Sequence, residues 1–247
     1  GNPDCRVVGM NTANIDLDFI RKCYDEGAAD SFDVMNVHYY AVDAPFERQY
    51  PEKQFADLRA LMAQYGDAHK PVLCSEGGGA SSGLPGTDEA WQADHLIRIY
   101  VISIANDIDK LCWTYELDMK PYGSKRVDMI MWMGLFRFDP KATPDNPCGE
   151  PKTSYNAMQT MTQQLLGTQY VGPVDAPEGV RAYRFGGERG EVLVAWAVEK
   201  GAEVDLPVEA ARVTIVNREG KETLMDAPAG RVRLKLTGSP VFVRVGH

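Results

Sequence analysis

Four short apolar segments alternate with four amphipathic segments, and this alternation constrains the fold more than any other feature of the sequence. The apolar segments cover residues 6–10, 32–40, 71–76 and 109–115. A stretch with the apolar spacing of a helix follows each of them, over residues 16–27, 52–66, from about 87 onward, and 153–167. Near-continuous apolar strands separated by helices are typical of a parallel sheet covered on both faces. The sequence therefore predicts an α/β domain over residues 1–167.

Glycines mark the ends of three of these predicted helices, at Gly27, Gly66 and Gly167. A glycine directly after the last apolar turn is a common helix terminator, because it adopts the left-handed conformation at little cost. In the last helix, the spacing of apolar residues predicts a buried face that begins at Tyr155 and ends at Leu165.

The period of the apolar residues changes from helical to two after Gly167. Six segments alternate apolar and polar side chains, over residues 180–185, 191–198, 202–206, 212–217, 231–236 and 240–245. This pattern predicts a small antiparallel β-sandwich over residues 168–247. No residue pattern in it indicates chemistry, so we expect it to serve packing.

Composition excludes several classes of function. The net charge of -9 argues against a nucleic-acid partner, which requires a basic face. No apolar run approaches the roughly 20 residues that span a bilayer, so no membrane partner is expected. The five cysteines form no C-x-x-C pair, and Cys74 and Cys112 lie in apolar segments, where we expect them to be buried. Residues 1–9 carry no signal-peptide pattern, and the sequence does not indicate a compartment.

Three chemically distinctive residues stand at the ends of successive predicted strands. His38, Glu76 and Trp113 are spaced 38 and 37 residues apart, about the length of one repeat of a (β/α) barrel. Active sites of such barrels lie at the carboxyl ends of the strands. Tyr39 and Tyr40 follow His38 and must point to opposite faces of their strand, so only one of them can face a site. A closed barrel needs eight strands, and the sequence predicts four.

Four motifs in this order resemble the second half of a clan A glycoside hydrolase, most of all the family 39 group of xylosidase-like and endo-glycosidase-like enzymes. The motifs are FDVMNVHYY (32–40), KPVLCSEGG (70–78), LCWTY (111–115) and GEPKTSYNAM (149–158). The resemblance covers nearly the whole chain. It implies a partial (β/α)8 TIM barrel, strands five to eight with their helices, followed by the β-sandwich.

The resemblance also implies roles for single residues. Glu76 corresponds to the catalytic nucleophile of a retaining enzyme, with His38 and either Tyr40 or Tyr39 as its hydrogen-bonding neighbours. Trp113 corresponds to the aromatic platform that lines the sugar site. The implied substrate is a carbohydrate with a β-glycosidic bond. Two carboxylates and water suffice for this reaction, so no metal and no cofactor is expected.

This sequence departs from the family at the general acid/base. That residue is a glutamate at the end of strand four, usually within Asn-Glu-Pro, and no Asn-Glu dipeptide occurs among the 247 residues. Glu116 and Asp118 follow Trp113, and we expect Glu116 near the mouth of the site as a substrate-binding residue. These residues alone are therefore expected to turn over aryl β-glycosides slowly or not at all. A clear turnover that Glu76→Gln abolishes would contradict this prediction.

Half a barrel leaves two strand edges without partners. The missing strands one to four are expected from a preceding segment of a longer enzyme, from a separate chain, or from a second copy that associates through the open edges. A different class of function remains open beside the hydrolase: a non-catalytic carbohydrate-binding or scaffold protein that keeps the sugar platform and lacks the acid.

Overall fold

The computed structural model describes residues 4–40, 51–119, 129–141, 143 and 149–246. The chain divides into two compact units. The first unit contains Gly1–Gly79 and Ile102–Thr114, and the second contains Ala80–Val101 and Tyr115–His247. The fold is α/β, with a parallel sheet in the first unit and antiparallel sheets in the second.

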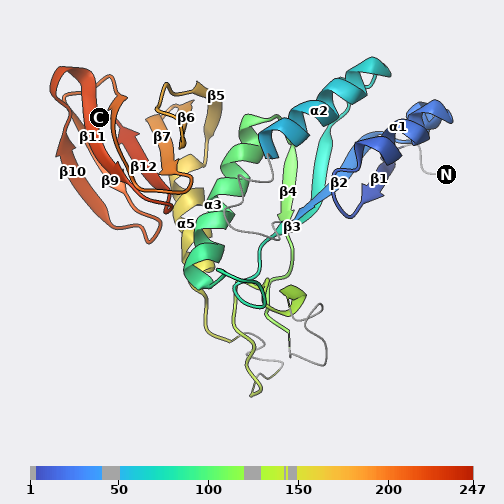
Figure 1. Ribbon diagram of the computed structural model, residues 1–247, viewed down its shortest axis with the longest axis horizontal. Coiled ribbons are helices and arrows are strands. Elements are labelled where there is room, and N and C mark those ends of the chain that lie inside the picture. The colour runs from blue at the N-terminus through green and yellow to red at the C-terminus, as the bar shows by residue number, and fades with distance from the viewer. Residues whose placement is uncertain (1–3, 41–50, 120–128, 142, 144–148, 247) are drawn as a thin grey trace. The chain divides into compact units, whose positions relative to one another are not determined.

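The first unit is built on a four-stranded parallel sheet in the order β1-β2-β3-β4, as Figure 1 shows. Its strands are β1 (Val8–Thr12), β2 (Val34–Tyr40), β3 (Val72–Gly78) and β4 (Lys110–Trp113). Helix α1 (Leu17–Asp25) connects β1 to β2, and α2 (Pro51–Gln64) connects β2 to β3. The four predicted strands and the order of strands and helices are confirmed.

Local sequence explains where these helices begin and end. The Asp16 carboxylate accepts a hydrogen bond from the Phe19 N–H at 3.0 Å and so caps the first turn of α1. Ile20 and Tyr24 form the buried face of that helix. Gly66 follows α2 with φ of 82°, a left-handed conformation that glycine adopts more readily than residues with a side chain. The predicted glycine terminator is confirmed at this position.

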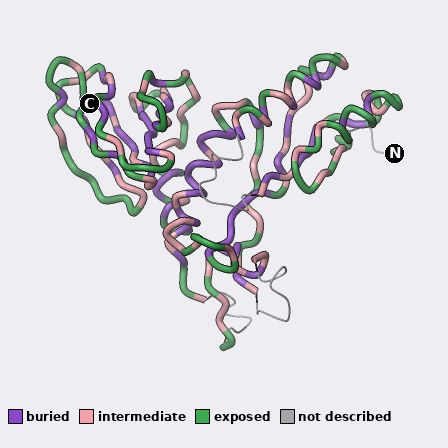
Figure 2. The backbone as a smooth tube through the Cα atoms, viewed as in Figure 1, coloured by how far each residue is buried: buried purple, intermediate pink, exposed green. Residues whose placement is uncertain are grey.

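Strands β2 and β3 contain both fully buried and partly exposed residues. Figure 2 colours the backbone by burial. Met35, Val37, Val72 and Cys74 are fully buried. His38, which follows Val37 on β2, is only partly buried. Because successive residues of a strand point to opposite faces, His38 shares the more open face with Tyr40.

The second unit contains most of α3 (Glu89–Ala105), whose last residues belong to the first unit, and all of α5 (Thr153–Leu165). It also contains a six-stranded antiparallel sheet, ordered β10-β9-β12-β7-β6-β5, and the pair β11-β8. The strands are β5 (Thr168–Pro173), β6 (Val180–Gly187), β7 (Gly190–Ala197), β8 (Ala202–Pro207), β9 (Arg212–Val216), β10 (Glu222–Asp226), β11 (Arg231–Leu236) and β12 (Val241–Val245).

One apolar core joins both antiparallel sheets. It includes Leu193 of β7, Val213 of β9 and Val243 of β12 from the larger sheet, and Leu206 of β8 and Val232 of β11 from the smaller one. All six predicted segments form strands, and the structure adds β5 and β10. These two strands are the edges of the six-stranded sheet.

Two sequence predictions were wrong. In α5 the buried residues include Ser154, Ala157 and Met161, whereas Tyr155 is exposed, so the buried face is rotated by one residue from the predicted one. The apolar spacing missed this face because it includes a buried polar residue: the Ser154 hydroxyl donates a hydrogen bond to the Gln92 side chain inside the unit. Cys112 is exposed, because it lies on β4, an edge strand of the parallel sheet.

Among the residues that the structure describes, no helix is long and apolar enough to cross a membrane.

Candidate active site

Glu76 lies near the carboxyl end of β3 beside two side chains of β2. The register pairs His38 with Glu76 and Tyr40 with Gly78. The Nδ1 atom of His38 is 3.5 Å from Glu76 Oε2, and the Tyr40 hydroxyl donates a hydrogen bond to the same oxygen. The Glu76 side chain is 48% exposed and that of His38 is 16% exposed. The carboxylate is therefore oriented by two neighbours while one side of it faces open space.

Tyr39 points to the opposite face of β2. It is 2% exposed, and its ring lies 5.5 Å from the ring of Phe55 in α2, measured between centroids. The sequence leaves open which tyrosine neighbours Glu76, and the structure brings Tyr40 to it. Tyr39 packs against the helix instead of meeting Glu76.

Trp113 is the last residue of β4, and its side chain lies next to Gly78 of β3. A Cβ atom added at Gly78 would lie 3.6 Å from the Trp113 indole, so the indole lies against the Gly78 backbone. Thr114 N–H donates to the Gly77 carbonyl at 2.9 Å and fixes the end of β4 beside β3. An aromatic ring and a carboxylate thus lie at the same end of the sheet.

Glu116 and Asp118 belong to the second unit. Glu116 is exposed, and its backbone carbonyl accepts hydrogen bonds from the N–H groups of Leu135 and Phe136 at 2.8 and 3.0 Å. Asp118 is 2% exposed and forms an ion pair of 3.0 Å with the fully buried Lys152. Asp118 is therefore a structural carboxylate, and the role expected for Glu116 stays a prediction.

The sequence did not single out two further residues, one bonded to Tyr40 and the other to the residue before Glu76. Thr114 Oγ1 donates to the Tyr40 hydroxyl at 3.3 Å. Asn36, 2% exposed on β2, accepts a hydrogen bond at Oδ1 from the Ser75 N–H at 3.1 Å. An amide side chain inside an apolar strand is the signal that would have identified Asn36, because buried polar groups require partners.

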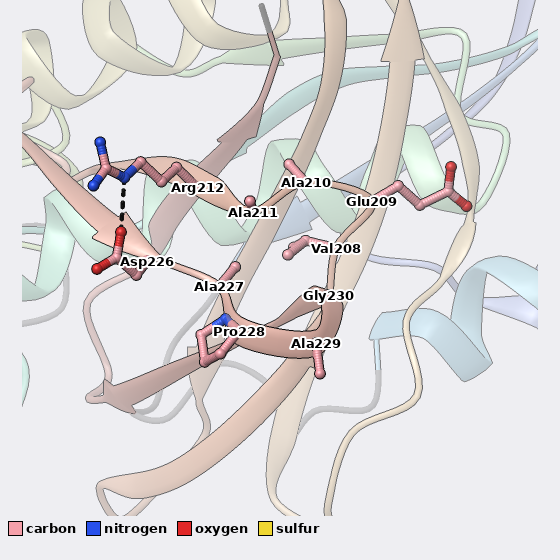
Figure 3. Close-up of a pocket in the computed structure, with 10 residues that line it drawn as sticks. All are labelled: Val208, Glu209, Ala210, Ala211, Arg212, Asp226, Ala227, Pro228, Ala229 and Gly230. Atoms are coloured by element: carbon pink, nitrogen blue, oxygen red, sulfur yellow. Dashed lines mark hydrogen bonds and ion pairs between the residues drawn. The ribbon is translucent and has the colours of Figure 1, made fainter.

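The described residues include no group of three or more histidine, cysteine, aspartate or glutamate side chains arranged to hold a metal ion. A hollow of about 650 Å³ in the second unit is lined by residues 208–212 and 226–230 (Figure 3). Four of its ten lining residues are alanine, and Arg212 forms an ion pair of 2.7 Å with Asp226. We assign no chemistry to this hollow.

Comparison with solved structures finds glycoside hydrolases. A family 39 glycoside hydrolase from the gut symbiont Bacteroides cellulosilyticus WH2 matches 92% of this chain and 47% of its own, with a TM-score of 0.70 and 18% identity. A GH30 endoxylanase from Clostridium papyrosolvens C71 matches 100% of this chain and 57% of its own, at a TM-score of 0.63 and 12% identity. A GH39 β-xylosidase from Caulobacter crescentus matches 100% of this chain and 58% of its own, with a TM-score of 0.59 and 16% identity.

This chain shares its fold with family 39 and family 30 glycoside hydrolases, so the predicted resemblance to such enzymes is confirmed at the level of the fold. The chain spans about half the length of these three structures. No protein-family model matches the sequence, and no curated protein is detectably similar to it.

Proposed function

We propose that this chain is part of a retaining glycoside hydrolase and that Glu76 is its nucleophile. The observation that carries the proposal is the cluster at the strand ends, where Tyr40 and His38 both approach Oε2 of an exposed glutamate. The shared fold with glycoside hydrolases supports it. The same cluster on an unrelated fold would indicate only a hydrogen-bonded carboxylate.

The proposed reaction uses the two oxygens of Glu76 differently. Oε2 accepts the Tyr40 hydrogen bond and lies beside His38, which leaves Oε1 for attack on the anomeric carbon. As the bond from Oε1 to that carbon forms, the glycosidic C–O bond breaks, and the leaving oxygen takes a proton from a separate acid. Water then hydrolyses the glycosyl ester and regenerates the carboxylate. Trp113 supplies the platform on which the sugar stacks.

The acid is not assigned within these residues. A retaining enzyme needs its second carboxyl group about 5–5.5 Å from the nucleophile. We propose that β1 to β4 are strands five to eight of a (β/α)8 barrel within residues 1–167, and that residues 168–247 form a β-sandwich domain. Strand four, and the acid/base with it, then lies in a further segment or chain. No metal or cofactor takes part in the proposed reaction.

A covalent probe tests the nucleophile without requiring the acid. A dinitrophenyl 2-deoxy-2-fluoro-β-glycoside carries a leaving group that departs as an anion without protonation. We expect Glu76 to become esterified as dinitrophenolate is released, and peptide mass spectrometry to locate the sugar on residue 76. The probe is applied as several glycosides, including the xyloside and the glucoside.

Glu76→Gln should abolish the labelling, because an amide is a poor nucleophile. Glu203→Gln is the matched control, since Glu203 lies on β8, where its carboxylate pairs with Lys235 at 3.3 Å. Sugar binding by calorimetry without any labelling would contradict the proposal and favour the rival function, a non-catalytic carbohydrate-binding protein.

Edge strands β1 and β4 suggest where further strands attach. Val8 on β1 is 42% exposed, and Cys112 on β4 is also exposed. We propose that a preceding segment covers these edges. Light scattering after size exclusion separates this arrangement from self-association: we expect a monomer at every concentration. A dimer that grows with concentration would instead support closure by a second copy.

A further inference from the structure

One extra residue interrupts β3 directly before Glu76. On the β2 side, Val37 pairs with Cys74 and the next residue, His38, pairs with Glu76, which skips Ser75. On the β4 side, Leu111 pairs with Cys74 and Trp113 pairs with Gly77. The step between these pairs is two residues along β4 but three along β3. Both neighbouring strands therefore record the same single-residue bulge, located between Cys74 and Gly77.

The bulge decides which face Glu76 occupies. Cys74 is fully buried, and in an uninterrupted strand Glu76 would share its face, because residues two apart point the same way. Continued without a bulge, the register would place Glu76 opposite the buried Tyr39. Instead it lies opposite His38, with its side chain 48% exposed. One inserted residue thus moves the carboxylate from the buried face to the open one.

Asn36 holds the backbone at this bulge. The bulge takes the Ser75 N–H out of the regular ladder, and Asn36 Oδ1 accepts a hydrogen bond from it at 3.1 Å. The Nδ2 of Asn36 donates to Asn11 Oδ1 at 2.6 Å. Asn11 follows Met10, which has φ of 66°, inside a register shift of β1. One buried amide therefore links irregular points of the two strands on either side of β2.

We infer that Asn36 is a positioning residue: it holds the Ser75 bulge and thereby presents Glu76 to His38 and Tyr40. This inference rests on the proposed function only for its catalytic consequence. The placement of the Glu76 carboxylate by Asn36 can be measured without any glycosidase reaction.

Asn36→Leu tests the inference, because leucine has a similar size and offers neither an acceptor nor a donor. We expect the Ser75 amide to exchange about tenfold faster with solvent, as its hydrogen-bond partner is gone. At saturating fluoroglycoside, the rate of labelling should fall about 100-fold or more, since a misplaced nucleophile loses its attack geometry. The probe concentration that gives half-maximal rate should stay unchanged, because Trp113 is untouched.

Asn36→Asp is the conservative variant. It keeps an oxygen for the Ser75 N–H, and the exposed Asn11 can turn its NH2 group toward the new carboxylate. We expect labelling at least about tenfold faster than in Asn36→Leu. Asn11→Ala, which removes only the outer partner, should give a smaller loss and serves if Asn36→Leu does not fold. Circular dichroism establishes that each variant is folded.

Carbodiimide coupling of an amine to exposed carboxylates supplies a readout that does not depend on glycosidase chemistry. Glu76 should be modified several times more slowly in Asn36→Leu, whereas the exposed Glu26 should be modified as before. If the wild-type protein remains unlabelled by the fluoroglycoside while carbodiimide still modifies Glu76 more slowly in Asn36→Leu than in wild type, the proposed function fails and the positioning role of Asn36 stands. A folded Asn36→Leu protein with unchanged Glu76 modification and unchanged Ser75 exchange would overturn the inference.

Discussion

Replacing Lys152 with methionine is expected to lower the free energy of unfolding of the second unit by about 3–5 kcal/mol. Lys152 is 0% exposed, and its ammonium donates to both carboxylate oxygens of Asp118, at 3.0 and 3.2 Å, and to the Trp132 carbonyl at 3.2 Å. Methionine fills similar space but leaves the Asp118 carboxylate buried without its counter-charge. Urea unfolding, with hydrogen exchange of α5 peptides to report on this unit, measures the loss.

The loss of stability in Lys152→Met should depend on pH, and the burial of Asp118 determines the direction of that dependence. Burial raises the pKa of Asp118 above its ordinary value, and the Lys152 ammonium opposes that rise. Without the ammonium the pKa of Asp118 should rise further, so the variant retains stability while Asp118 is protonated and loses it as the pH rises through that pKa. The difference between wild type and Lys152→Met should therefore be larger at about pH 8 than at about pH 5.

Two control variants separate the buried charge from the loss of a long side chain. Arg212→Met removes one partner of an exposed ion pair, in which Arg212 and Asp226 side chains are 67% and 76% exposed, and should change stability little. Lys152→Met combined with Asp118→Leu removes both buried charges and should recover part of the loss. A double variant no more stable than Lys152→Met would show that packing, and not charge, dominates.

The strands and helices of the first unit were predictable because each combines a strong period with a clear terminator. Leu58 and Met62 on α2, and Val72 and Cys74 on β3, are buried as their spacing predicts. The edge strands β5 and β10 of the other sheet were not found. Along β10 only Met225 is partly buried, so burial imposes almost no apolar period on its sequence.

The candidate site was predictable by residue type but not by geometry. The motif order identified Glu76, His38 and Trp113, whereas the choice of Tyr40 over Tyr39 depends on which face α2 covers. The bulge at Ser75 is harder still, because β3 ends with Glu76, Gly77 and Gly78, so no apolar side chain after the bulge records the change of face. A sequence-based model with a regular β3 would place Glu76 on the face of Cys74.

Phe55→Ala is expected to destabilise the first unit by about 3–5 kcal/mol, the usual cost of removing a fully buried phenylalanine ring. Phe55 is 0% exposed in α2 and packs against Tyr39 of β2. That packing keeps Tyr39 on the helix-covered face and, by alternation, Tyr40 on the face of Glu76. The cavity should therefore loosen the strand that carries His38 and Tyr40 as well as lower the free energy of unfolding.

Phe19→Ala is the matched control, because Phe19 belongs to the same unit but is 48% exposed. It should cost far less than Phe55→Ala in urea unfolding, since little apolar area is lost from the interior. Hydrogen exchange distinguishes a local effect from a global one: amides of β2 should exchange faster in Phe55→Ala, while those of β7 in the other unit keep their protection. Equal losses from the two substitutions would mean that α2 contributes no more to the stability of this sheet than the exposed face of α1. The alternation of β2 would then have to be fixed by strand pairing alone.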